Sequence, residues 1–230
     1  MKRLLSLATL LMLCLSGLSA QSQGGAPIKV FAINLDATPV DIKLGTADSV
    51  VFAANNLAAN GATKLVTLQK SGSWPMYYGS VGSQLKSLRN PQGQPFSFAL
   101  QNGKTYVIRY LGQDNIDLFE LTEPNTSSAK IAFVNNSGSS VGQIQVGSAF
   151  GQNTLVLMKD LPNGEHSNFG SINFAAAYGI FWASGNASPT TFSDASGKVV
   201  TTLFAEGSYW VFLLKQDQTK ALGSLINITP

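Results

Sequence analysis

Apolar and polar residues alternate with a period of two along much of the chain. Every second residue is apolar in VDIKL at 40–44 and in FSFAL at 96–100. This period places successive side chains on opposite faces of a β-strand, so strands should dominate. Further strands are expected at 64–69, 76–80, 105–111, 116–121, 153–158, 179–183, 199–204, 209–214 and 222–228. The one helix-like stretch is 53–59, which the following Asn60-Gly61 limits to a turn or two.

Two halves of the chain repeat each other. IKVFAIN at 28–34 is echoed by AKIAFVN at 129–135, an offset of 129 − 28 = 101 positions. Three segments match in the same order: 28–34 with 129–135, 40–45 with 141–147, and 103–108 with 207–212. Each half therefore predicts one structural unit of about 100 residues, the size of a small β-sandwich with turn signals every 8 to 12 residues.

The predicted fold is all-β, with two tandem antiparallel β-sandwich modules after an N-terminal signal peptide. The first module is expected at 27–122 and the second at 129–230. Between them, 123–128 is a polar stretch with one Pro, typical of an exposed linker that few contacts cross.

The first twenty residues have the pattern of a secretory signal. Lys2 and Arg3 precede an apolar run at 4–15, and small residues end the segment at Ser19 and Ala20. No later apolar run is long enough to cross a bilayer, so no transmembrane segment is expected after signal removal. An uncleaved anchor is the alternative, whereas the Leu before Cys14 argues against a lipoprotein.

Removal of the signal changes both charge and cysteine content. The full chain carries 15 basic and 12 acidic residues, and losing Lys2 and Arg3 leaves 13 against 12. The remaining net charge of +1 offers no basic stripe for nucleic acid. Cys14, the only cysteine, leaves with the signal, so the mature chain forms no disulfide.

Catalytic and cofactor signals are weak, so the sequence predicts a noncatalytic protein without cofactors or metals. His166 is the only histidine and lies among turn formers, which indicates a surface loop. Ser140 satisfies a G-x-S-x-G pattern, but it precedes a strand where a nucleophile elbow precedes a helix. Calcium near Asp114 is a minor alternative, and no Gly-rich phosphate loop is present.

The aromatic residues are better candidates for an interaction surface. Adjacent rings such as Tyr77-Tyr78 point to opposite faces of a strand, so some should reach the surface and contact a sugar or a protein. Core or intermodule packing is the alternative. The candidates are Trp74, Tyr77, Tyr78, Trp182 and Trp210.

The order of signal, module, Pro-containing linker and module resembles the periplasmic alginate O-acetylation protein AlgF family. The resemblance rests on the openings at 28–34 and 129–135, which end in Asn, and on the Gly-led strands at 103–107 and 207–211. It implies a noncatalytic periplasmic adaptor in the O-acetylation of an alginate-like exopolysaccharide, with acetyltransferase proteins as partners and the polysaccharide as a further candidate partner. The alternative is a secreted or cell-surface β-sandwich repeat protein, similar to the DUF4397 family, that binds carbohydrate or protein through exposed aromatics.

Overall fold

The chain folds entirely into strands and turns wherever its structure is described. The computed structural model describes residues 25–46, 48–148, 155–172, 177–183, 190–191, 196, 198–215 and 222–230, so the expected signal peptide and Cys14 lie outside the described residues. Within these ranges there is no helix, and hence none that could span a membrane. The all-β prediction is confirmed.

The first module consists of two sheets. Its inner sheet has the strand order β10-β9-β1-β4, with β5 also paired to β1, and its outer sheet has the order β3-β2-β6-β7, with β8 also paired to β6. The strands are β1 (Ile28–Asn34), β2 (Val40–Gly45), β3 (Val50–Leu57), β4 (Gly61–Ala62), β5 (Val66–Leu68), β6 (Gly72–Ser80), β7 (Lys86–Ser87), β8 (Ser97–Leu100), β9 (Thr105–Gly112) and β10 (Asn115–Leu121).

The second module repeats this arrangement. Its inner sheet has the order β14-β11-β18-β19, and its outer sheet β13-β12-β15-β16, with β17 also paired to β15. The strands are β11 (Ala129–Asn136), β12 (Val141–Ser148), β13 (Leu155–Leu161), β14 (Gly170–Ile172), β15 (Ala177–Ala183), β16 (Thr190–Thr191), β17 (Thr201–Leu203), β18 (Tyr209–Lys215) and β19 (Leu222–Asn227). Strands β1 and β11 thus occupy equivalent positions, as the repeat predicts.

The pairing is antiparallel except at one place in each module. β1 runs parallel to β9 with Lys29 opposite Thr105, and β11 runs parallel to β18 with Lys130 opposite Tyr209. The sequence repeat is thus also a repeat of strand pairing, with offsets of 130 − 29 = 101 for the first strand of each pair and 209 − 105 = 104 for the second. Parallel neighbours need a long crossover, and here the rest of each module supplies it.

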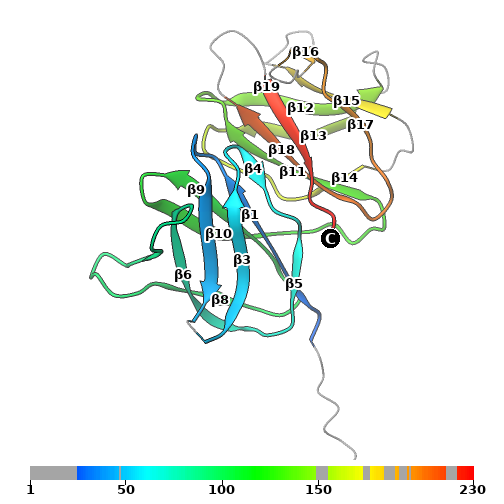
Figure 1. Ribbon diagram of the computed structural model, residues 1–230. Coiled ribbons are helices and arrows are strands. Elements are labelled where there is room, and N and C mark those ends of the chain that lie inside the picture. The colour runs from blue at the N-terminus through cyan, green and yellow to red at the C-terminus, as the bar shows by residue number, and fades with distance from the viewer. Residues whose placement is uncertain are drawn as a thin grey trace, which may run out of the picture.

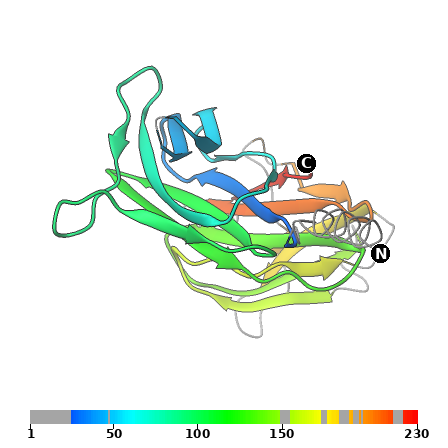
Figure 2. The ribbon, with the colours of Figure 1, turned by 90° about the horizontal axis from the view of Figure 1, so that it is seen from below.

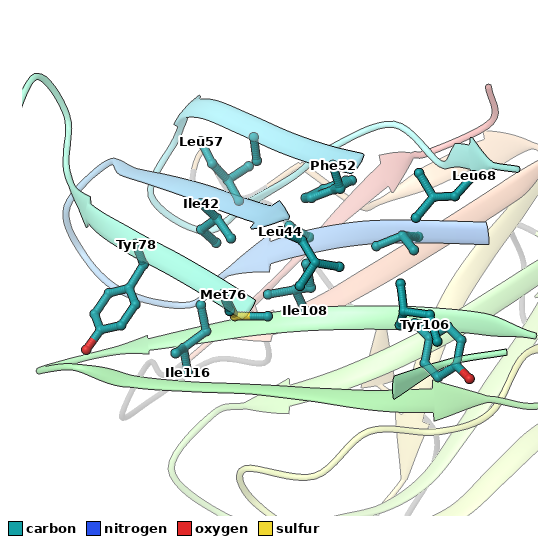
Figure 3. Packing of buried hydrophobic residues seen from close by; sticks show 14 of the residues in the cluster. Ile42, Leu44, Phe52, Leu57, Leu68, Met76, Tyr78, Tyr106, Ile108 and Ile116 are labelled. Atoms are coloured by element: carbon teal, nitrogen blue, oxygen red, sulfur yellow. The ribbon is translucent and has the colours of Figure 1, made fainter. Parts of the chain in front are cut away.

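The four sheets stack as layers, with the two inner sheets facing each other (Figures 1 and 2). Three apolar clusters fill the spaces between them. The first core lies between the sheets of the first module, where Ile42 and Leu44 of the outer sheet point toward Ile108 of the inner sheet (Figure 3). The second core fills the second module in the same way. The third cluster, which we call the joint, lies between the modules.

Burial on both faces explains the apolar runs of β1 and β11. In β1, Val30 faces the first core while Phe31 and Ile33 face the joint. In β11, Ile131 faces the second core and Ala132 faces the joint. A strand covered on both faces needs apolar residues at successive positions instead of every second one.

The Asn that ends each opening strand is a buried clamp. Asn34 is fully buried, and its Nδ2 donates to the carbonyl oxygens of Thr38 at 2.8 Å and Leu57 at 3.0 Å. Its Oδ1 accepts from the backbone N–H of Asp36 at 2.9 Å. The amide thereby holds the β1–β2 turn against the end of β3.

Asn135 repeats the clamp in the second module. Its Nδ2 donates to the carbonyl oxygens of Ser139 and Leu161, both at 2.8 Å, and its Oδ1 accepts from the N–H of Ser137 at 3.0 Å. No other side chain offers two donors and an acceptor in so small a volume, so the repeat ends in Asn both times.

The helix-like expectation for 53–59 is wrong, because most of this segment belongs to strand β3. Asn56 has φ of 51°, and its backbone N–H donates to Oδ1 of Asp41 at 2.6 Å. The register against β2 shifts between Val40 and Ile42. The Asn pair therefore marks a β-bulge in which one residue adopts the left-handed conformation that Asn tolerates.

Replacing Asn135 by Ala should destabilise the protein by about 2 to 3 kcal/mol, because the buried carbonyl of Leu161, the carbonyl of Ser139 and the N–H of Ser137 lose their partner. Urea unfolding of the mature protein measures the change. Asn55→Ala, at an exposed position of β3, is the control and should leave the midpoint nearly unchanged. Equal small effects for the two variants would contradict the clamp.

Candidate functional site

The structure distributes the aromatic candidates of the first module between core and surface. Tyr78 is 5% exposed and packs in the first core, while its neighbour Tyr77 is half-buried on the other face of β6, opposite Lys43. Trp74 is half-buried against the first core, and its Nε1 is buried without a hydrogen-bond partner among the described residues. Only Tyr77 thus lies on a face that no apolar cluster covers.

The second module gives a different result. Adjacent Tyr209 and Trp210 do point to opposite faces of β18, but Tyr209 faces the joint and Trp210 packs against the second core. Neither ring therefore projects from an open sheet face. Trp182 lies in β15 opposite Ile144 of β12, and its side chain lies outside the described residues.

Trp210 nevertheless lines a cavity of about 330 Å³ at the flank of the second module. The cavity lies between β17 and the edge strand β19. Its other lining residues are Lys198, Val199, Val200, Thr201, Thr202, Gly223, Ser224 and Leu225. An indole thus meets several hydroxyl groups at one place.

A connected group of polar side chains lies at the border of the joint, around Glu123. Its carboxylate accepts hydrogen bonds from Nζ of Lys29 at 2.9 Å, from the hydroxyl of Tyr209 at 2.8 Å and from that of Thr105. Nζ of Lys130 lies 3.5 Å from the same carboxylate. The Tyr209 hydroxyl in turn accepts from both lysines, at 2.7 and 3.0 Å. This Glu123 cluster connects β1, β9, the linker, β11 and β18.

Hydrogen bonding outweighs burial in this cluster. Burial alone would raise the pKa of Glu123, but the bonds from Thr105, Lys29 and Tyr209 lower it below its usual 4.5. Burial alone would also lower the pKa of Lys29, yet its bonds to Tyr209 and Glu123 raise it above 10.5. Both groups therefore stay charged at neutral pH and hold the modules together.

His166 lies in a loop, as the sequence predicts, but its ring is half-buried beside the joint and is not free on the surface. Its ring stacks on Phe119 of the first module, with centroids 3.4 Å apart and planes at 18°. Arg109 lies beside this stack, bonds Asp117 through two contacts and donates to the carbonyl of Gly164. Burial, and then the positive charge of Arg109, lower the pKa of His166 from 6.5.

The linker also differs from the sequence prediction of an exposed connector. The side chain of Glu123 is only 17% exposed. The backbone of Thr122 accepts from Phe169 N–H at 3.1 Å and donates to Asn168 Oδ1 at 3.0 Å. The start of the linker is thus held beside the joint, whereas Asn125 and Ser127 are exposed. A carboxylate in an otherwise uncharged linker is the one sequence signal that could have indicated this role.

Beside the Glu123 cluster, a pocket of about 490 Å³ opens to the surface. Lys29, Lys104, Glu120 and Glu123 line it together with Thr105. Lys104 and Glu120 form their own ion pair at 2.7 Å. With two cations and two anions already paired, this pocket presents no net charge to a ligand.

The two residues considered for catalysis lie in different turns, Ser140 between β11 and β12 and His166 between β13 and β14. Ser140 is exposed in the β11–β12 turn, equivalent to Pro39 in the first module. Nδ1 of His166 is buried without a hydrogen-bond partner in the described part of the chain, and its ring is occupied by Phe119. Among the described residues, no group of three His, Cys, Asp or Glu could hold a metal ion.

No protein-family model and no curated protein matches the sequence. Among solved structures, a proposed cell adhesion protein from Bacteroides uniformis is similar at 9% identity, covering 90% of this chain and 99% of that one, with a TM-score of 0.25. A second, from Parabacteroides distasonis, shares 9% identity over 90% and 98% of the two chains, with a TM-score of 0.19. Likeness at this level carries no argument about function.

Replacing Glu123 by Gln should destabilise the protein by about 2 to 3 kcal/mol, because two partly buried lysines lose their counter-ion. Chemical denaturation at pH 7 measures the loss. The matched control is Glu120→Gln, which breaks an exposed ion pair and should change stability little. An equal loss of unfolding free energy in Glu120→Gln would contradict the role of the Glu123 cluster in stabilising the fold.

Stability should fall as the pH drops below 6.5, because the unfolded chain binds a proton at His166 more readily than the folded chain does. The contribution of His166 to stability is fully present above pH 6.5, and the decline ends once the pH is below the pKa of His166 in the folded protein. His166→Gln should flatten the decline between pH 7 and 5, which unfolding at several pH values measures. No other histidine titrates in this range. An unchanged slope in the variant would contradict the assignment.

Proposed function

We propose that this protein is a noncatalytic binding protein, secreted or at the cell surface, that contacts carbohydrate or protein. The observation that carries the proposal is the joint. Phe31, Ile33, Val211 and Leu213 are each 0% exposed between the modules, and they form one apolar layer. Such an interface favours a single rigid body over two independently moving domains.

The placement of the reactive groups supports a noncatalytic role. The Glu123 cluster and the Arg109–Asp117 pair connect structural elements, and the His166 ring packs on Phe119. A general base needs hydrogen-bond reach to the group it activates, and a ring stacked inside an interface offers little of this. These ionisable side chains thus stabilise the fold by connecting its strands and loops.

The localisation part of the proposal rests on the N-terminal sequence. A basic start, an apolar run and small residues at 1–20 are typical of an export signal. The absence of cysteine from the mature chain is compatible with any compartment, because the folded modules are held by apolar packing and hydrogen bonds and need no disulfide.

An adaptor for polysaccharide acetyltransferases in the periplasm is the second proposal, and the AlgF resemblance motivates it. The Asn clamps give the strand-ending Asn a structural reason in both modules. The Asn at the end of each opening strand therefore supports a fold in common with the AlgF family more than a binding partner in common with it. A gene for a membrane-bound O-acyltransferase beside this one would favour the adaptor over the surface protein.

The mature protein should bind polysaccharide or a protein partner without turning it over. The assay incubates the wild type and Ser140→Ala with an acetylated polysaccharide and with an acetyl donor, and follows acetate release and acetyl transfer. We expect no activity from either protein beyond the buffer blank. Acetate release or transfer that Ser140→Ala abolishes would overturn the noncatalytic proposal.

A further inference from the structure

We propose that the cavity beside Trp210 is a binding site for uncharged sugar units of a polysaccharide. This inference rests on the proposed function and names its site and ligand class. The cavity, about 330 Å³, is near the lower end of the range of about 300 to 1,000 Å³ typical of ligand pockets. It therefore suits one or two sugar rings.

The indole that lines the cavity is held in place before any ligand arrives. Nε1 of Trp210 donates to Oγ of Ser208 at 2.8 Å, and Oγ of Ser208 donates to the carbonyl of Ala205. Phe204 packs edge-on against the indole with centroids 5.4 Å apart. A preorganised aromatic surface loses little conformational entropy on binding.

The first module provides an internal comparison, because Tyr106 occupies the position of Trp210. Tyr106 lies opposite Val30 in the parallel pair, as Trp210 lies opposite Ile131. Tyr106 is only 5% exposed, and its hydroxyl accepts from the backbone N–H of Gln101 at 3.1 Å. The first module thus buries its ring and uses its polar group internally, while the second leaves a half-buried indole beside open space.

The lining chemistry favours sugar over other ligands. The apolar C–H face of a pyranose packs on an indole, and its hydroxyls exchange hydrogen bonds with hydroxyl side chains such as Thr201, Thr202 and Ser224. Lys198 is the one ionisable residue of the lining, which gives a polyanion little to bind. Val199, 39% exposed, lies at an accessible part of the lining.

Titration of the mature protein with uncharged hexasaccharides of glucose, mannose and N-acetylglucosamine, followed by calorimetry, tests the site. Two further titrations test other ligand classes: hexamannuronate represents a charged polysaccharide, and an amphipathic peptide represents a protein partner. We expect at least one uncharged hexasaccharide to bind. Val199→Arg, which places a long side chain at the cavity, should weaken it at least tenfold. Trp210→Phe should weaken it while keeping the contact with Phe204.

The matched control is Val50→Arg on β3 of the first module, where Val50 is 51% exposed. It should bind like the wild type. Sugar binding that survives both Val199→Arg and Trp210→Phe would overturn this site and leave the proposed function standing. Binding of the peptide or of hexamannuronate alone, lost in Val199→Arg, would overturn the ligand class. Failure to bind any of these ligands would overturn this inference, and the acetyl-transfer assay judges the noncatalytic role separately.

Discussion

The fold depends on burying both faces of two equivalent strands, β1 and β11. Each contributes one face to its own module and the other to the joint, so the same seven-residue opening builds three apolar clusters. Burial of apolar area is the dominant favourable term in folding. The joint therefore shares its strands with both cores, and stability in one module supports the other.

Polar groups fix the geometry that apolar burial leaves open. Apolar contact is not directional, whereas the Glu123 cluster and the Arg109 contact to Gly164 each allow one arrangement of the modules. These bonds lie at the border of the apolar layer and connect residues up to 180 positions apart, as between Lys29 and Tyr209. The polar bonds thus fix the orientation of the two modules, and burial of the apolar layer supplies most of the free energy that holds them together.

Local alternation and internal repetition make most of the strands predictable. The period of two predicts β2 and β8, and the internal repeat makes β1 equivalent to β11, at an offset of 129 − 28 = 101, and β9 equivalent to β18, at an offset of 209 − 105 = 104. The segment 53–59 is misleading because Ala and Asn have no strong strand preference, and the register of the neighbouring strand decides its structure.

The candidate site is harder to predict, because it depends on how the two modules face each other. Locally, Glu123 stands out only as the one charged residue of the linker, and nothing in the sequence around His166 distinguishes it from a solvated loop histidine. Their partners, Lys29 and Phe119, lie 94 and 47 positions away. The sequence does single out Trp210, but the cavity beside it depends on the relative position of β17 and β19, which the sequence does not give.

The parallel pairing of β1 with β9 affects the order in which the first module can fold. Every partner of β1 follows it in the chain: β4 and β5 can pair with one of its edges early, but its other edge stays unpaired until β9, near the end of the module, has emerged. High contact order of this kind slows folding, and it leaves one edge of an apolar strand open to aggregation until its parallel partner arrives.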